Sequence, residues 1–121
     1  MLQLKIFDHY IRPTNSYVNL KQTGNLEVTT GTKRWYSPTA TTTLSKIVAR
    51  VDTAPVGSDI NITINKNGST AATLTISDGG TKIINSTPNI IMVEDDYLTV
   101  DITQIGSSTT GSDLTITFTY S

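Results

Sequence analysis

Apolar and polar residues alternate along this chain, and that alternation constrains the fold more than any other feature. Residues 59–65 read Asp-Ile-Asn-Ile-Thr-Ile-Asn, and the same pattern returns in residues 98–102 and 114–118. A side-chain period of two indicates a β-strand with one buried face and one solvated face, and it does not fit an amphipathic helix. The sequence therefore predicts a protein made of β-sheet.

Turn residues rich in Gly, Asn, Asp and Ser separate the predicted strands. Such turns recur about every 8 to 12 residues, which is typical of two-layer antiparallel sheets. We therefore predict an all-β fold, a two-layer antiparallel β-sandwich of the jelly-roll or immunoglobulin-like kind. The expected strands are residues 2–7, 17–20, 26–29, 42–51, 59–65, a partner strand that ends before residue 78, and then 81–85, 88–93, 97–105 and 113–120.

The hairpin after residue 65 can be predicted in more detail from its register. A two-residue loop at Asn67-Gly68 would place Lys66 opposite Ser69 and would send later apolar residues to the wrong face. A three-residue loop, with Gly68 as a bulge, keeps all apolar residues on one face. We therefore predict the three-residue loop, which pairs Ile64 with Thr70, Ile62 with Ala72 and Ile60 with Leu74.

The length of 121 residues fits one compact unit with a single core. We predict that residues 32–121 form the sandwich domain. The alternation is weak from residue 8 to residue 34, and a segment poor in core residues cannot easily offset the cost of ordering its backbone. We therefore expect residues 1–31 to form an N-terminal strand and an extended arm that docks on a neighbouring molecule.

Composition and charge argue against several classes of protein. The chain has no cysteine, which excludes a disulfide framework and thiol chemistry, and no long apolar run or export signal predicts a membrane location. The net charge of −1 argues against nucleic-acid binding. Residues 1–50 hold seven basic and two acidic residues, whereas residues 51–121 hold two basic and eight acidic ones. Either the halves form oppositely charged surfaces, or interleaved strands mix the charges.

No pattern in the sequence indicates catalysis, a cofactor or a metal. His9 is the only histidine and has no patterned partner, so we expect a loop residue rather than a catalytic base. Residues 94–96 are all acidic and, with Asp101, could hold calcium, but they lack the spacing of known calcium loops and also fit a solvated turn. The glycines at 79–80 and in 106–111 lack the phosphate-binding patterns. We therefore expect no enzyme.

Cations and large aromatic residues coincide at one place, Lys33-Arg34-Trp35-Tyr36. Trp, Tyr and Arg are enriched in binding hot spots, so these four residues are the predicted partner-binding site. In the alternative interpretation, Trp35 caps the core while Lys33 and Arg34 only reach solvent.

Six fragments of the sequence, taken in their order and spacing, resemble a β-sandwich module that recurs in tailed-bacteriophage virion proteins. They are residues 35–38 (Trp-Tyr-Ser-Pro), 47–51 (Ile-Val-Ala-Arg-Val), 54–59 (Ala-Pro-Val-Gly-Ser-Asp), 62–68 (Ile-Thr-Ile-Asn-Lys-Asn-Gly), 96–102 (Asp-Tyr-Leu-Thr-Val-Asp-Ile) and 111–116 (Gly-Ser-Asp-Leu-Thr-Ile). The resemblance covers residues 32–120, while residues 1–31 and the absence of a repetitive shaft depart from the fibre members of the family.

In that family the module occurs on capsid decoration proteins and on head or tail fibres, commonly as trimers and without enzymatic activity. The resemblance therefore implies a structural protein of the virion, a decoration or cement protein that binds the major capsid protein and stabilises the head after assembly in the host cytoplasm. It favours a homotrimer, with a dimer next. The alternative is a fibre or receptor-binding module that recognises a host-surface carbohydrate, with Trp35, Tyr36 and Tyr97 as a stacking platform.

Overall fold

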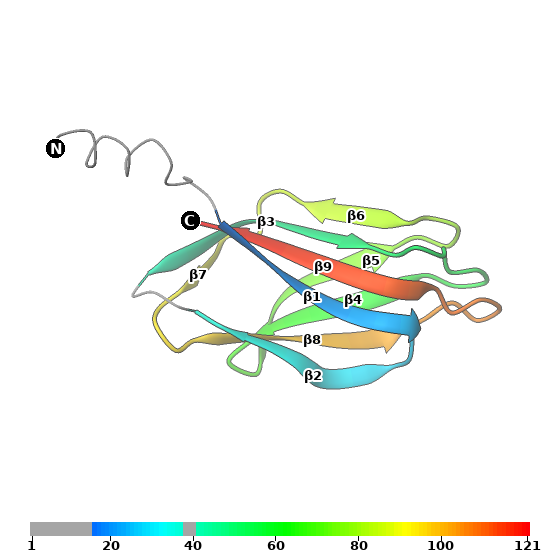
Figure 1. The fold of residues 1–121 in the computed structure, drawn as a ribbon, viewed down its shortest axis with the longest axis horizontal. Helices are drawn as coiled ribbons and strands as arrows, with labels where there is room; N and C mark the ends of the chain where they lie inside the picture. The colour runs from blue at the N-terminus through cyan, green and yellow to red at the C-terminus, as the bar shows by residue number, and fades with distance from the viewer. Residues whose placement is uncertain (1–15, 38–40) are drawn as a thin grey trace, which may run out of the picture.

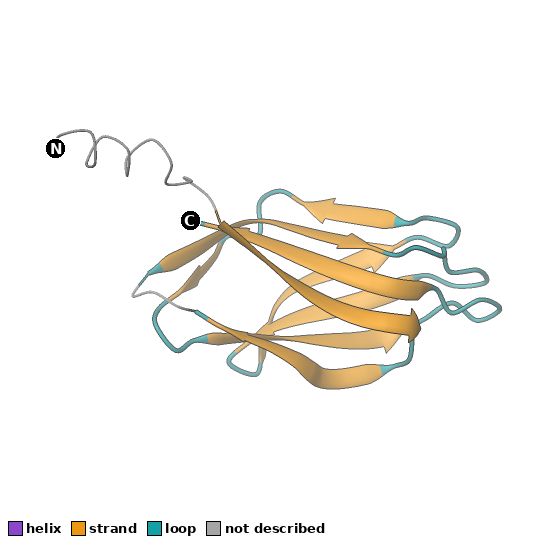
Figure 2. Cartoon of the chain, in the orientation of Figure 1, coloured by secondary structure: helices purple, strands orange, loops and turns teal. Residues whose placement is uncertain are grey.

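Two antiparallel sheets packed face to face make up the fold of the computed structural model, which describes residues 16–37 and 41–121 (Figure 1). This confirms the predicted all-β sandwich, and Figure 2 shows strands joined by loops throughout the described chain. The described residues include no helix long and apolar enough to cross a membrane. The strands are β1 (Ser16–Asn25), β2 (Thr29–Tyr36), β3 (Thr42–Arg50), β4 (Ile60–Lys66), β5 (Ser69–Ile76), β6 (Lys82–Asn85), β7 (Ile90–Met92), β8 (Tyr97–Gln104) and β9 (Ser112–Tyr120).

The first sheet has the strand order β1-β9-β3-β6, and β7 pairs with the other end of β3. The second sheet has the order β2-β8-β4-β5. Each sheet turns one face inward, and the alternating residues of β9 show how: Leu114, Ile116 and Phe118 are fully buried, while the threonines between them point outward. The period-two pattern therefore marks the walls of a single core.

Strand β3 has one inward and one outward face, although it contains one extra residue. The register with β9 shifts between Leu44 and Lys46, so that Ser45 is an extra residue in β3. After this bulge, Ile47 and Ala49 point into the core. The outward face of β3 then carries Lys46, Val48 and Arg50.

The predicted three-residue hairpin loop is wrong. Strands β4 and β5 are joined by the two-residue turn Asn67-Gly68, and both residues have the positive φ angles, 51° and 88°, that a type I′ turn requires. Lys66 lies opposite Ser69, as the rejected alternative had it. The register is corrected inside β5 instead, where Ala71 is an extra residue.

That bulge also changes which residues of β4 and β5 lie opposite each other. Ile64 pairs with Ala72, Ile62 with Leu74 and Ile60 with Ile76. The apolar residues of both strands still share the buried face. The alternation thus determined the buried face correctly, but it did not determine where the extra residue is inserted.

Part of the expected N-terminal arm belongs to the sandwich. From Ser16 onward, residues of the 1–31 segment form β1, which pairs with β9, and the start of β2, which pairs with β8. Leu26, in the connection between these strands, is fully buried. The expected strand at residues 2–7 and His9 lie outside the described residues, and the docking role of the segment stays a prediction.

Candidate functional surfaces

The four predicted partner-binding residues lie on β2, at the edge of the second sheet, and the strand divides them between two faces. Side chains alternate across a strand, so that Lys33 and Trp35 belong to the inward side and Arg34 and Tyr36 to the outward side. The four residues therefore do not form one continuous surface. Their partners on β8 are Val100 for Lys33, Thr99 for Arg34, Leu98 for Trp35 and Tyr97 for Tyr36.

Trp35 packs against the core. Its ring lies 5.1 Å from the ring of Tyr120, measured between centroids, at an interplanar angle of 44°. Trp35 is partly buried and contacts the hydrophobic cluster between the sheets. This agrees with the interpretation in which Trp35 caps the core, and it separates Trp35 from the stacking platform proposed with Tyr36 and Tyr97.

On the outward side, Arg34, Tyr36 and Tyr97 form a compact group, which we call the tyrosine–arginine cluster. The guanidinium carbon of Arg34 lies 4.5 Å from the centroid of the Tyr97 ring, and its Nη1 donates a hydrogen bond of 3.2 Å to the hydroxyl of Tyr36. The two tyrosine rings are 5.5 Å apart and tilted by 48°. The hydrogen bond to Tyr36 raises the pKa of Arg34 above its ordinary value.

The acidic residue next to Tyr97, Asp96, is already engaged with the chain. The carboxylate of Asp96 accepts hydrogen bonds from the Asn67 amide at 2.9 Å and from the Val93 backbone at 2.9 Å, which lower its pKa, and Lys66 lies 3.8 Å away. Asp101, the other carboxylate of the calcium alternative, has different partners. Within residues 16–37 and 41–121, no three acidic or histidine side chains converge as metal ligands would.

Asp101 is the centre of a hydrogen-bonded line that crosses all four strands of the second sheet. Its Oδ1 accepts from the backbone N–H of Gly31 on β2 at 2.7 Å, and its Oδ2 accepts from Nδ2 of Asn65 on β4 at 2.8 Å. Asn65 in turn accepts from the hydroxyl of Thr70 on β5 at 3.4 Å. This line ties the edge strand that carries the tyrosine–arginine cluster to the rest of the sheet.

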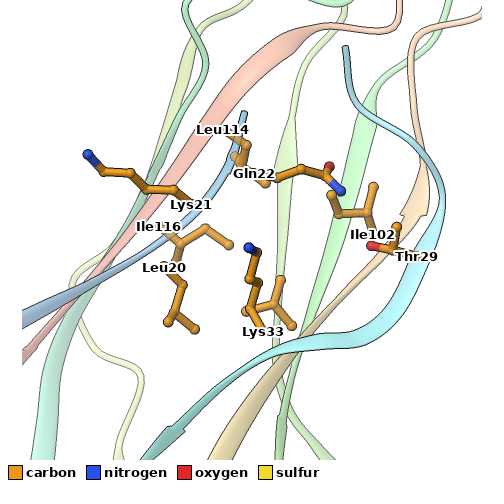
Figure 3. Close-up of a pocket in the computed structure, with 9 residues that line it drawn as sticks. Leu20, Lys21, Gln22, Thr29, Lys33, Ile102, Leu114 and Ile116 are labelled. Carbon is orange, nitrogen blue, oxygen red and sulfur yellow. The ribbon is translucent and has the colours of Figure 1, made fainter. Parts of the chain in front are cut away.

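A small opening between the sheets lies where β1 and β2 face each other (Figure 3). Its volume of about 10 Å³ corresponds to about one water molecule, so it is too small for an organic ligand. The side chain of Lys33 reaches into it, and an inward-pointing charge of this kind protects a sheet edge against further pairing. Its apolar walls are Leu20, Val100, Ile102, Leu114 and Ile116.

The outer face of the first sheet is the feature that sequence reasoning missed. Four exposed cations, which we call the basic face, project from three of its strands: Lys21 from β1, Lys46 and Arg50 from β3 and Lys82 from β6. The grouping of Lys46 with Arg50 was visible in the alternation of β3. Lys21 and Lys82 join these two residues only because β1, β9, β3 and β6 are neighbours in the sheet, and the sequence does not indicate that strand order.

No protein-family model matches this chain, and no curated protein sequence is similar to it. Solved structures share its fold. The acid-stable capsid of Helicobacter pylori bacteriophage KHP30 is 7% identical over 91% of this chain and 89% of its own chain, with a TM-score of 0.56. The Drosophila NLP core, studied for pentamer formation and histone binding, is 9% identical over 87% of this chain and 97% of its own, with a TM-score of 0.51.

A carbohydrate-binding module also has a similar structure. It is the CBM36-1 domain of a multidomain xylanase from the hindgut metagenome of Trinervitermes trinervoides, and it is 12% identical over 88% of this chain and 95% of its own. Its TM-score is 0.47. At identities this low, the similarities concern the fold alone. The chain has a β-sandwich fold of a kind that is also found in a phage capsid.

Proposed function

We propose that this protein is a non-enzymatic structural component of a tailed-bacteriophage virion, a capsid decoration or cement protein that binds the major capsid protein and stabilises the head. One observation carries the proposal: the tyrosine–arginine cluster and the basic face lie on the broad outer faces of the two sheets rather than in an enclosed pocket. Broad faces with aromatic and cationic groups suit contacts between proteins. The sequence resemblance and the fold shared with a phage capsid support the same role.

The test is the location of the protein in the phage that encodes it. Purified virions, and heads separated from their tails, are analysed by quantitative mass spectrometry. A decoration protein is expected on the heads, in a fixed ratio to the major capsid protein, and heads that lack it are expected to burst at a lower temperature. Its absence from purified virions would contradict the proposal, and its presence on tails alone would favour a fibre.

The docking role of the N-terminal segment is tested with a chain that begins at Ser16, which retains all nine described strands. This truncated chain is expected to fold as the full chain does and to lose its attachment to heads. A longer deletion, to residue 31, would remove β1 and is not a suitable test because β9 would lose its partner. Undiminished attachment of the truncated chain would exclude the segment as the docking element, but it would not contradict the proposed role in the virion.

We propose a homotrimer as the assembled form, with a dimer as the alternative. Analytical ultracentrifugation of the free protein, together with its stoichiometry on heads, measures this directly. A stable monomer in both settings would contradict it.

A second candidate function, the recognition of a host-surface carbohydrate, is favoured by the tyrosine–arginine cluster. Tyr36 is 52% exposed and tilts against Tyr97 beside the Arg34 cation, and exposed aromatic faces of this kind can stack on sugar rings. Glycan-array binding that is lost on Tyr36→Ala and on Tyr97→Ala, and kept on Tyr17→Ala, would support it. Tyr17 is the control because it is a still more exposed tyrosine, at 69%, and lies on the other sheet.

A further inference from the structure

We propose that the basic face of the first sheet binds an acidic surface of a protein partner, through its cations and through the exposed apolar side chains of Tyr17 and Ile84 beside them. The inference rests on the geometry of this face, and it stands whether or not the chain belongs to a virion.

The register of the first sheet places the cations in rows across the strands. Lys21 on β1 and Arg50 on β3 both lie opposite Thr115 of the intervening strand β9, and Lys82 on β6 lies directly opposite Arg50. Three cations thus follow one line across the sheet. Lys46 lies further along β3, opposite Thr119.

Three apolar residues lie among these cations and the threonines of β9. Val48 lies opposite Ile84, in the row next to Arg50 and Lys82. Val48, Tyr17 and the stems of Lys46 and Arg50 line a shallow groove of about 340 Å³. Tyr17 is 69% exposed and Ile84 is 46% exposed, so two large apolar side chains are left open to solvent beside the positive charges.

The carboxylates nearest to this face lie at one end of it. Asp113 on β9 and Asp52, which follows β3, share a hollow with Lys21, and Asp113 also accepts a hydrogen bond from the backbone N–H of Gly24 at 2.8 Å. The residues directly opposite the four cations are threonines or another cation, and none is a carboxylate. Among the described residues, the one ion pair joins Lys66 to Asp96, far from this face in the strand order.

The arrangement costs stability in the free protein. Like charges directly opposite each other on neighbouring strands repel, as Arg50 and Lys82 do here. An anionic partner would turn this repulsion into attraction, and complementary charge both speeds the encounter and selects the partner. The positions of the cations therefore fit a role in binding better than a role in folding.

The apolar residues favour a protein as the partner over a nucleic acid. Four cations can neutralise about four phosphates, which supplies little affinity at physiological salt, and the net charge of the chain is −1. Tyr17 and Ile84 are exposed and gain from apolar groups that cover them, which phosphates cannot provide. A protein surface that offers both carboxylates and apolar side chains meets both requirements.

Three probes test the proposal: polyglutamate, a glutamate–leucine copolymer of the same charge, and duplex DNA. Binding to the full chain is mapped by the shifts of backbone amide signals in nuclear magnetic resonance spectra at low salt. We expect both acidic polymers to shift signals of β1, β3, β6 and β9, and we expect the copolymer to bind more tightly than polyglutamate. Ile84→Ser is expected to abolish that difference while leaving polyglutamate binding unchanged.

The decisive comparison uses two variants with the same change in charge. The triple variant K46Q/R50Q/K82Q changes the net charge from −1 to −4, and so does the control K33Q/R34Q/K66Q, which leaves the basic face intact. We expect the first to weaken copolymer binding by about tenfold or more, because three favourable charge contacts are lost, and the second to keep the affinity within about a factor of two.

Equal weakening in both variants would show that net charge alone is responsible and would overturn the proposal. Shifts confined to the second sheet, or the absence of any shift, would overturn it too. DNA that binds the basic face more tightly than the copolymer does would assign the face to a nucleic acid instead. Circular dichroism establishes that both triple variants are folded, and single substitutions at Lys46 and Arg50 replace the triple variant if it is not.

Discussion

Asp101 offers the sharpest test of how the second sheet is held together. Its carboxylate accepts from Gly31 at 2.7 Å and from Asn65 at 2.8 Å, and a hydrogen bond to a charged group contributes about 1.5 to 3 kcal/mol. Asp101 is partly exposed, so each bond contributes at the lower end of that range. Asp101→Ala, which removes both bonds, is therefore expected to lower the free energy of unfolding by about 3 kcal/mol.

Asp101→Asn is expected to lower the free energy of unfolding by less, about 1 kcal/mol, because donors and acceptors can be exchanged along this line of hydrogen bonds. The new amide would accept from Gly31 and donate to Asn65, whose own amide would turn and donate to the hydroxyl of Thr70. This rearrangement predicts a coupling. Thr70→Val should cost about 0.5 kcal/mol or less in the wild type, where its bond is 3.4 Å long, and about 1 to 2 kcal/mol in the Asn variant.

Urea denaturation of the four proteins of this cycle, followed by circular dichroism, measures each free energy. Glu94→Gln, in an exposed turn, is the control for the loss of a negative charge. The reasoning would be refuted if Asp101→Ala and Asp101→Asn were equally stable, or if Thr70→Val cost the same in both backgrounds. Either result would mean that the line of hydrogen bonds does not act as a unit.

Three further predictions test other parts of the molecule. Gly106→Ala should lower the free energy of unfolding by about 2 kcal/mol or more in urea denaturation, because its Cβ would overlap the backbone carbonyl of Thr109. Asp96 has a lowered pKa, so its carboxylate stabilises the fold above its ordinary pKa of 3.8 and this contribution is lost as the pH falls. The stability gap between wild type and Asp96→Asn should therefore be largest at neutral pH and close in acid, as thermal unfolding at several pH values would show. Lys82→Gln should raise the free energy of unfolding by about 0.3 kcal/mol at low salt, by removing the repulsion from Arg50, and the gain should vanish in concentrated salt.

The fold could be predicted where every inward position of a strand is apolar. In β9, for example, Leu114, Ile116 and Phe118 alternate with threonine, and all three are buried. Strand β1 was read only in part, as residues 17–20, because it lies at the edge of its sheet and needs fewer apolar residues. Val18 and Leu20 pack against the core, but the next inward position is Gln22, which breaks the pattern.

The error in the hairpin has a physical reason. A glycine bulge in the loop and an extra residue within the strand both restore the same buried face, so the alternation cannot distinguish them. The pair Asn67-Gly68 is itself a strong signal for a two-residue type I′ turn, since both residues tolerate positive φ. Local turn chemistry should have outweighed the register argument, and Ala71 shows where the strand absorbed the difference.

The alternation of side chains along a strand also divides the predicted partner-binding site between two faces. Neighbours in sequence point to opposite sides of a strand, so a run of four residues could not form one surface once it was placed on β2. Arg34 and Tyr36 remain together because they are two positions apart. Tyr97, which completes their cluster, is distant in sequence and is brought there by the register between β2 and β8.

The basic face could not be predicted because its members meet only through the strand order β1-β9-β3-β6. Lys21, Arg50 and Lys82 are each about thirty residues apart in the sequence, and the net charge of −1 does not indicate that they lie in one row across the sheet. The total charge therefore says little about what any one face can bind, and it cannot alone exclude an anionic partner. What distinguishes a protein partner from a nucleic acid on such a face is the chemistry beside the cations. Here Tyr17 and Ile84 are exposed next to them, and only a partner that brings its own apolar groups would gain from covering these side chains.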